Sequence, residues 1–240
     1  MKRVQTKKAL KVMGVLGGMG PVASADFYRS VIEIAQRDYH AEQDIDFPAI
    51  IIYSMPVADF DETGFIDFKS VRKQLITGVR KLEKAGSDFI VIPCNTVHLF
   101  YHDMQASVHI PIISILDVTT KSIQQHGYKK AGLLNSESAR QCRLYEPAFA
   151  DQGIVAVSTT ETEQKDVNRA ILHVMSGTQG KEDIARLQAI INRFAGEGAQ
   201  VVVLGCTELP LAISSGDIDL PLFSSSALLA EAAVRYAYSK

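Results

Sequence analysis

The feature of this sequence that most restricts its fold is an apolar run, closed by a cysteine, that occurs twice. The first copy reads FIVIPCNT (residues 89–96) and the second reads VVVLGCTE (residues 201–208). Each run is short, rich in Val and Ile, and broken by a Pro or a Gly, a pattern typical of a fully buried parallel strand. A residue directly after such a strand lies where open α/β sheets bind ligands. The sequence therefore predicts that Cys94 and Cys206 reach two strand ends by the same local route.

The two cysteine segments belong to a longer internal repeat. GVL at residues 14–16 matches GLL at 132–134, and PIIS at 111–114 matches PLFS at 221–224, in the same order and at nearly constant spacing. Strand-like runs alternate with helical patterns, which indicates parallel sheets with right-handed crossovers. We therefore predict an α/β protein of two similar lobes. Each lobe has a parallel, mostly four-stranded sheet flanked by helices, and the active site lies in the cleft between them.

The repeat also predicts the domain boundaries. Residues 1–117, with Cys94, are expected to form lobe one, and residues 118–218, with Cys206, to form lobe two. The last strand and helix, within residues 219–240, match 110–125, so this segment is expected to return and join lobe one. Within lobe two, residues 136–149 are predicted to be one helix. Residues 158–166 are predicted to be a polar connection before a helix that begins at Val167.

Composition limits the classes of partner. The 240 residues are 47% hydrophobic and 22% charged, which is typical of a globular protein with a proper core. A formal net charge of −2 argues against nucleic acid or an anionic membrane as the main partner, because both require a basic face. No apolar segment reaches the roughly 18 residues that a membrane-spanning helix needs. We therefore expect a small-molecule partner.

The start of the chain imitates a signal peptide, with a basic beginning and an apolar stretch that ends in ASA (residues 23–25). Glycines at 14, 17, 18 and 20 interrupt that stretch, and it has a better use as a strand and turn, so we expect no export. The three cysteines show no disulfide-framework spacing, which favours a reducing cytoplasm.

Two loops are expected near the site. The first strand, residues 12–17, runs into the turn GGMGP (17–21), which lacks both the G-x-G-x-x-G and the Walker lysine patterns of nucleotide-binding loops. A glycine-rich backbone beside a helix N-terminus suits a small carboxylate better. Residues 57–67, after the second strand, are acidic and rich in turn formers, which predicts an exposed loop that can fold over a site.

A pair of opposed cysteines has a specific chemical use. The thiolate is the reactive form of cysteine, and helix N-termini and nearby cations favour it. A thiolate and a thiol on opposite sides of one carbon can act as a base on one face and an acid on the other. One group removes the α-proton and the other returns a proton from behind, which inverts the stereocentre. The pseudo-symmetry of the repeat suits this chemistry, because the forward and reverse reactions differ only in the enantiomer bound.

Other interpretations of these residues stay open at this point. A single buried Cys is commonly a small hydrophobic residue, and Cys142, which has no counterpart in the repeat, is interpreted as structural. A metal site is poorly supported because neither repeated Cys has a Cys or His two residues away, and no C-x-x-C indicates redox exchange. His98 is placed either to tune Cys94 or to cap a surface helix. Glu208 is either a partner for the Cys206 thiol or a carboxylate at a helix start.

Three motifs, GVLGGMGP (14–21), PCNTVH (93–98) and GCTELP (205–210), resemble those of the aspartate/glutamate racemase family, and the resemblance covers nearly the whole chain. It implies an enzyme of the isomerase class, an amino-acid racemase of two α/β lobes that needs no cofactor and is typically a homodimer. It implies that Cys94 handles the α-proton of the D-enantiomer and Cys206 that of the L-enantiomer. It further implies a set of residues that hold the α-carboxylate and ammonium: Gly18, Met19, Asn95, Thr96, Ser136 and Thr207. We add Glu208 to the substrate-binding residues.

One departure from the family bears on the substrate. Many aspartate racemases carry an arginine in a Pro-Asp-Arg-Thr run after the second strand, whereas residues 54–63 here read SMPVADFDET. Lys165, a loose match to a substrate-contacting lysine of some aspartate racemases, is the candidate replacement. We expect aspartate first, with glutamate or another amino acid as alternatives. The other hypotheses are a hydantoin racemase, a maleate-type isomerase, and a non-catalytic two-lobed binding protein.

Overall fold

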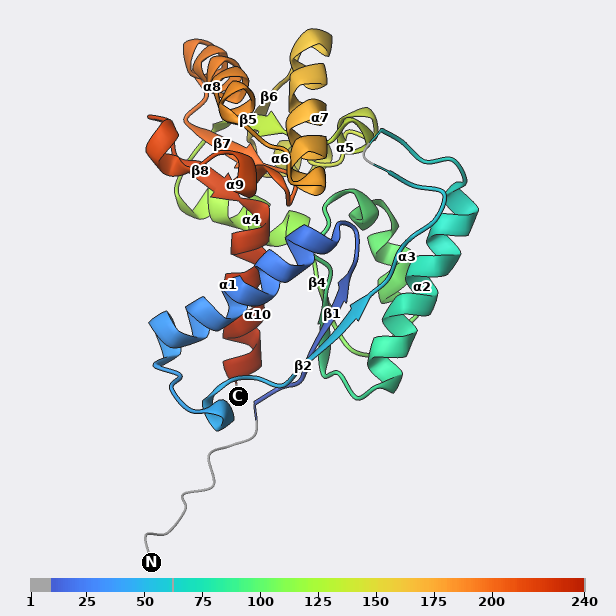
Figure 1. The fold of residues 1–240 in the computed structure, drawn as a ribbon. Coiled ribbons are helices and arrows are strands. Elements are labelled where there is room, and N and C mark those ends of the chain that lie inside the picture. Colours follow the sequence, from blue (N-terminus) through green and yellow to red (C-terminus); the bar gives the residue numbers. More distant parts are fainter. Residues whose placement is uncertain (1–9, 62, 240) are drawn as a thin grey trace, which may run out of the picture.

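A computed structural model of the chain describes residues 10–61 and 63–239. The basic residues Lys2, Arg3, Lys7 and Lys8 of the signal-like start lie outside the described residues. The described strands form two four-stranded sheets in which every pairing is parallel, one above the other in Figure 1. Helices flank both sheets, so the predicted α/β class is confirmed.

The two sheets have the same strand order, which is the structural form of the sequence repeat. The first sheet runs β2-β1-β3-β4 and the second runs β6-β5-β7-β8. The strands of the first sheet are β1 (Met13–Gly17), β2 (Ile50–Ser54), β3 (Phe89–Val91) and β4 (Ile112–Ile113). Those of the second are β5 (Lys130–Leu134), β6 (Val155–Ser158), β7 (Val201–Leu204) and β8 (Leu222–Ser224). In both sheets the strand that precedes a repeated cysteine, β3 or β7, is a central one.

The repeated glycine of each sheet is explained by a close approach. A Cβ atom on Gly132 of β5 would lie 2.3 Å from the ring of Phe194, and one on Gly14 of β1 would lie 2.5 Å from Ser87 Oγ. Phe194 lies in the last turn of α8, and Ser87 lies between the end of α2 and the start of β3. A residue without a side chain is therefore required at both repeat positions.

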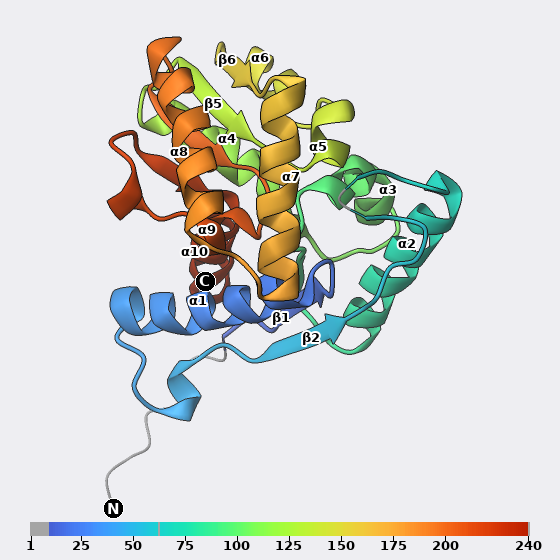
Figure 2. The same ribbon diagram turned by 45° about the horizontal axis from the view of Figure 1, so that its top comes forward.

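The helices cover both faces of each sheet (Figures 1 and 2). One face of the first sheet packs against α1 (Pro21–Tyr39) and α10 (Ser225–Tyr238), and the other packs against α2 (Phe68–Lys84). The second sheet packs against α7 (Glu161–Ser176) and α8 (Lys181–Gly196) on one face. The remaining α-helices are α3 (Tyr101–Gln105), α4 (Ile115–Gln125), α5 (Glu137–Gln141), α6 (Glu146–Asp151) and α9 (Leu209–Ala212). Short 3₁₀ helices are η1 (Asp44–Asp46), η2 (Thr96–Phe100) and η3 (Ser215–Asp217).

The segment 219–240, expected to join lobe one, divides between the two sheets. Its strand β8 pairs with β7 in the second sheet, whereas its helix α10 packs against α1 and α4. Leu229 and Val234 of α10 lie in the same core as Phe27 and Val31 of α1. Helix α4 also serves both sides, because Ile115 belongs to that core and Ile123 to a core of the second sheet. The lobe boundaries themselves stay a prediction.

Two helix predictions in the second half were wrong. The single helix expected over residues 136–149 is broken into α5 and α6, because Cys142 ends α5 and Arg143 takes a left-handed backbone with φ of 48°. The run 158–166, expected to be a connection, contains the first turns of α7. Thr160 caps that helix, accepting a hydrogen bond from the Glu163 N–H while the Glu163 carboxylate accepts from the Thr160 N–H.

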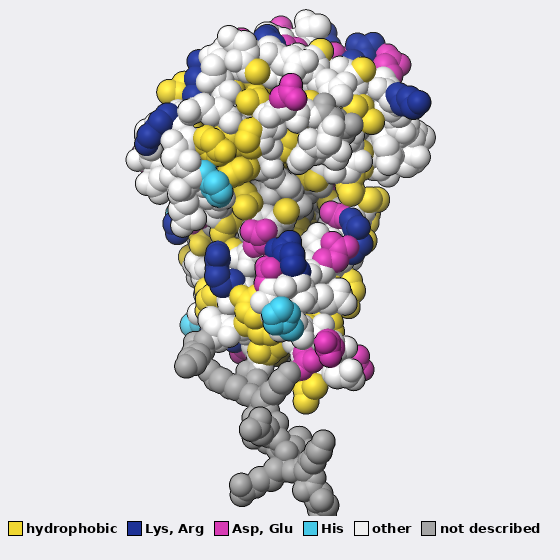
Figure 3. Space-filling view, turned by 90° about the vertical axis from the view of Figure 1, so that its left-hand side faces the viewer, with side chains coloured by type: hydrophobic (Ala, Val, Ile, Leu, Met, Phe, Trp, Pro, Cys, Tyr) yellow, Lys and Arg dark blue, Asp and Glu magenta, His cyan; other side chains and the backbone are white. Residues whose placement is uncertain are grey.

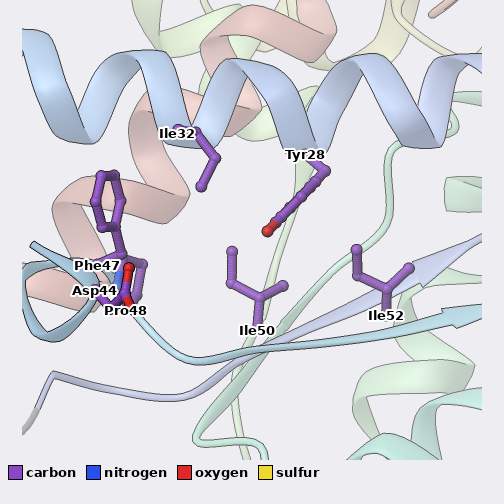
Figure 4. A pocket seen from close by; sticks show the side chains of 7 residues that line it. All are labelled: Tyr28, Ile32, Asp44, Phe47, Pro48, Ile50 and Ile52. Atoms are coloured by element: carbon purple, nitrogen blue, oxygen red, sulfur yellow. The ribbon is translucent and has the colours of Figure 1, made fainter.

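Apolar side chains also reach the surface, at the edge of the first sheet. β2 is the edge strand, and a hollow of about 470 Å³ lies between it and α1. In Figure 4, Tyr28 and Ile32 of α1 point down toward Ile50 and Ile52 of β2, and Phe47 stands at one end. Figure 3 shows one face of the molecule, on which hydrophobic side chains mix with charged ones. Within the described part of the chain, no helix has the length and apolar character needed to cross a membrane.

Candidate active site

The repeated cysteines occupy equivalent positions in the two sheets. Cys94 follows β3 and precedes η2, and Cys206 follows β7 and precedes α9. Both are reduced and buried, with 7% and 8% of their surfaces exposed. Burial raises the pKa of the Cys206 thiol well above its usual range, and Cys94 is among the neighbours that raise it further. A thiolate at Cys94 therefore disfavours ionisation of the Cys206 thiol.

Glu208 is a close neighbour of the Cys206 thiol. The Cys206 Sγ donates a hydrogen bond to Glu208 Oε2 at 3.1 Å, and the Thr207 hydroxyl donates to the same oxygen at 3.1 Å. After burial, the Glu208 carboxylate is the main cause of the raised pKa of Cys206, because a negative charge beside a thiol disfavours the thiolate. This arrangement favours the protonated thiol of Cys206.

His98 fixes the backbone that carries Cys94. Its Nδ1 is hydrogen-bonded to the Cys94 carbonyl at 2.8 Å, and its Nε2 accepts from the Ile115 N–H at 3.2 Å. The side chain is buried, with 3% exposed, so it does not cap a surface helix. Burial lowers the pKa of His98 to about 4, which keeps the ring neutral near pH 7. His98 therefore joins the end of β3 to the start of α4.

The glycine turn lies against two other parts of the site. Gly18 has φ of 97°, its N–H donates to Ser24 Oγ at 2.9 Å, and a Cβ there would meet the Met55 nitrogen at 2.5 Å. A Cβ on Gly20 would lie 3.0 Å from Glu208 Oε1. Since Glu208 follows Cys206 in the second sheet, the turn after β1 reaches the opposite strand end. Met19, between these glycines, is buried.

The small polar residues after Cys94 bond across to the second sheet. Thr96 and Ser136 share a hydroxyl–hydroxyl hydrogen bond of 3.1 Å. The Asn95 amide donates to Ser225 Oγ at 3.0 Å, and the Tyr145 hydroxyl donates to Asn95 Oδ1. Ser136 also caps α5. The structure therefore brings the carboxyl ends of β3 and β5 together, along with those of β1 and β7 described above.

The sequence model of the Asp/Glu/hydantoin racemase family matches residues 16–233. The chain belongs to this family. The resemblance noted in the motifs is thus confirmed, and the protein is an enzyme of the isomerase class, because racemases are isomerases.

Individual relatives of this racemase-family chain span nearly its full length. It is 32% identical over 223 residues to the broad specificity amino-acid racemase RacX of Bacillus subtilis, covering 93% of this chain and 96% of RacX. An aspartate racemase homologue from Pyrococcus horikoshii superposes with a TM-score of 0.82 at 28% identity, covering 96% of this chain and 100% of that one. The Picrophilus torridus aspartate racemase gives a TM-score of 0.82 at 26% identity, with coverage of 96% and 95%.

The loop after β2 crosses to the second sheet of this family member. The carbonyl of Asp61 accepts a hydrogen bond from Ser138 Oγ of α5 at 2.9 Å, and Figure 1 shows the loop reaching α5. Phe65 of the loop stacks on Phe60 and Phe68, with ring centroids 4.9 and 4.5 Å away, and packs edge-on against Phe100. The loop is therefore held at its aromatic base against α2 and η2 and at its tip on α5.

The candidate residues of this racemase-family site divide into two groups. One group is buried around the strand ends: Cys94, Asn95, Thr96, Ser136, Cys206, Thr207 and Glu208. Lys165 differs, since it is exposed on α7 and makes no hydrogen bond or ion pair with the described residues. Sequence reasoning missed Tyr145 and Ser225, which bond to Asn95 from distant parts of the chain. No group of three or more potential metal-ligating side chains was found among the described residues.

Proposed function

We propose that this protein is a cofactor-independent racemase that inverts the α-carbon of an acidic amino acid, aspartate first and glutamate second, with Cys94 and Cys206 as its acid–base pair. The observation that carries the proposal is the equivalent placement of two buried cysteines, each directly after a central strand of one of two sheets that have the same strand order. The family membership supports the reaction type.

The mechanism follows from the protonation states. A thiolate at Cys94 removes the α-proton from one face of the substrate, and the Cys206 thiol donates its proton to the opposite face of the carbanion. The products are the other enantiomer, a Cys94 thiol and a Cys206 thiolate, and the reverse reaction begins from that state. Since Cys206 holds a proton in the free enzyme, the free enzyme is ready to convert the enantiomer whose α-hydrogen faces Cys94. The family resemblance makes that substrate the D-enantiomer.

Substrate positioning is assigned to the polar strand ends. We propose that Gly18, Met19, Asn95, Thr96, Ser136 and Thr207 hold the α-carboxylate and the ammonium. The exposed Lys165 is the proposed cation for a side-chain carboxylate, in place of the arginine missing from residues 54–63. The division into lobes at 1–117 with 219–240, and 118–218, is part of the same proposal, with the site between the lobes.

A second candidate differs only in substrate range. The relative that is 32% identical is named a broad specificity amino-acid racemase. The loop after β2 lacks the arginine that would grip a side-chain carboxylate. A panel of enantiomers, including D- and L-aspartate, D- and L-glutamate, and neutral and basic amino acids, separates this candidate from an aspartate-selective enzyme. A hydantoin and maleate in the same panel test the other two enzyme hypotheses.

The test of the reaction is exchange of the α-hydrogen in D2O without pyridoxal phosphate, followed by chiral chromatography. We expect Cys94→Ser and Cys206→Ser each to lower racemisation by about 10²- to 10⁴-fold, because a hydroxyl is a far weaker acid–base group near neutral pH. Cys142→Ser is the matched control and should keep the parental rate, because Cys142 ends α5 and lies outside the proposed pair. Parental racemisation by either site variant would disprove the two-thiol scheme, and a wild type without any exchange would favour a binding protein.

We also propose a cytoplasmic homodimer. The resemblance implies the dimer, and three free cysteines in a chain with two of them buried at the site suit a reducing compartment. Sedimentation analysis of the purified protein gives its mass in solution, and fractionation of the source cells gives its compartment.

A further inference from the structure

One carboxylate oxygen of Glu208 has no hydrogen-bond partner among the residues that the structure describes. Oε2 accepts hydrogen bonds from Cys206 and Thr207, whereas Oε1 is buried and accepts none from residues 10–61 or 63–239. Only 3% of the residue is exposed. A buried acceptor without a donor is costly, and more so when it carries charge. Such an atom at a strand end is therefore expected to receive a donor from a ligand.

The surroundings of Oε1 show which way it points. It lies beside Gly20, where even a Cβ atom would be only 3.0 Å away, so the turn after β1 comes directly up to it. Gly20 is the N-cap of α1, which has no side-chain cap and no acidic residue in its first turn. The helix dipole therefore favours a negative charge at this place. Since Oε1 accepts no hydrogen bond from the α1 backbone, it does not serve as that cap.

Both partners of Oε2 are consistent with an ionised carboxylate, since Cys206 and Thr207 act as donors. Oε1 lies beside the glycine turn after β1, on a residue that follows Cys206 by two positions, and an ionised oxygen there can accept a donor. A cationic donor suits it best, because hydrogen bonds between charged groups are the strong ones. The α-ammonium of an amino acid is such a donor, and it is attached to the carbon that the proposed reaction inverts.

We infer that Glu208 Oε1 binds the α-ammonium of the substrate, and that it restricts this enzyme to substrates with a free, protonated α-amino group. This inference rests on the proposed function. It distinguishes among the chemistries open to the family, because hydantoins, maleate and N-acylated amino acids have no ammonium to offer. Glu208 thereby takes a role apart from that of the cysteines, as the residue that selects the substrate class.

The same contact couples binding to acid–base chemistry. In the free protein the negative charge of Glu208 disfavours the Cys206 thiolate. An ammonium on Oε1 offsets that charge, so a bound amino acid lowers the barrier to releasing the Cys206 proton. A ligand without an amino group gives no such help.

The first test uses the wild-type enzyme and the amino acid that exchanges fastest in the D2O assay. Its binding, measured by thermal shift titration, is compared with that of its desamino analogue, which is succinate in the case of aspartate. We expect the amino acid to bind about 10- to 100-fold more tightly, the range of a charge-assisted hydrogen bond. Equal affinities would overturn the inference and leave the proposed racemase intact. A wild type that exchanges no amino acid at all would remove the proposed function and this inference with it.

The second test uses Glu208→Gln, which keeps the shape and the acceptor for the thiol but removes the charge. We expect KM for the amino acid to rise about 10- to 100-fold and the preference over the desamino analogue to disappear. The rate of Cys206 alkylation, followed by peptide mass spectrometry across pH, should reach its midpoint at a lower pH than in the wild type. A merely structural role would not move that midpoint. A variant that keeps the preference for the free amine would overturn the inference.

Glu146→Gln is the matched control for this substitution. Glu146 begins α6, which packs against α4 and β6, and its Oε2 is also buried without a hydrogen-bond partner. It lies outside the hydrogen bonds that join the strand ends. We expect this variant to keep both the KM and the alkylation profile of the wild type, which separates the position of Glu208 from the general effect of removing a carboxylate.

Discussion

His98 uses both ring nitrogens inside the protein. The Ile115 N–H donates to Nε2, so Nε2 is unprotonated and the neutral ring carries its hydrogen on Nδ1, which donates to the Cys94 carbonyl. A second proton on the ring would turn Nε2 into a donor facing another donor. Burial disfavours the charged ring as well, and it lowers the pKa of His98 to about 4 from an ordinary value of 6.5.

This histidine should make stability depend on pH. Between about pH 6.5 and 4 the unfolded chain binds a proton at His98 and the folded chain does not, so stability falls as pH falls through this window. The shift corresponds to about 3 kcal/mol of unfolding free energy. We expect His98→Gln to be less stable than the wild type at pH 8, by about 1–2 kcal/mol for its poorer hydrogen bonds, and to lose less stability on acidification.

Urea denaturation at a series of pH values measures both effects. His109→Gln is the control, because the His109 side chain is 99% exposed and its removal should leave the acid dependence unchanged. If His98→Gln and the wild type lost stability in parallel down to pH 4, His98 would not be the group responsible.

At the scale of single residues, the equivalent placement of Cys94 and Cys206 after a buried strand could be predicted, because each closes an apolar run at a matched repeat position. Asn95 and Thr96 followed from their place beside Cys94. Tyr145 and Ser225 could not be predicted, since their bonds to Asn95 are set by how the two sheets face each other. No local pattern in a sequence carries that information.

At the scale of elements, the start of α7 also depends partly on residues that a sequence pattern reveals and partly on contacts that it does not. Residues 158–166 lack apolar periodicity, so a polar connection was expected there, yet Thr160 and Glu163 form a capping box. A Thr three residues before a Glu, the pattern typical of a capping box, is present in the sequence. The second contribution was not visible: Arg193 of α8 forms an ion pair with Glu163 and donates to the Ser158 carbonyl.

We predict that Thr160→Ala lowers the free energy of unfolding by about 1 kcal/mol, because the N–H of Glu163 loses its side-chain acceptor. Thr160→Ser keeps the hydroxyl and should stay within a few tenths of a kcal/mol of the wild type. Chemical denaturation of the two variants side by side gives the comparison. Equal stability of the alanine and serine variants would mean that Arg193 and packing, and not the Thr160 cap, determine where α7 begins.

For the whole molecule, the repeat was enough to predict two similar parallel sheets, because each half carries the full pattern of strands. It was not enough to place the end of the chain. Strand β8 stays with the second sheet through its pairing with β7, while α10 leaves that sheet to pack on α1. The spacing of apolar residues in α10 is compatible with packing on either sheet. Only the shapes of the packing surfaces decide which sheet it covers.

A core shared in this way should unfold as one unit. Leu229 of α10 is fully buried in the core beneath the first sheet. We expect Leu229→Ala to cost about 2–5 kcal/mol and to lower hydrogen-exchange protection in β1 and β7 together. Leu172→Ala, at a side chain 46% exposed on α7, is the control and should change little. Loss of protection confined to one sheet would mean that the sheets unfold independently.

The crossing of α10 also has a consequence for synthesis on the ribosome. The strands of the first sheet leave the exit tunnel early, but the layer that covers them beside α1 is translated only after the whole second sheet. Until then Phe27, Val31 and the inner side of β1 lack the neighbours that bury them in the finished protein. Nascent chains stalled between residues 130 and 220 should for this reason bind chaperones that recognise exposed apolar segments, and release them once α10 has emerged.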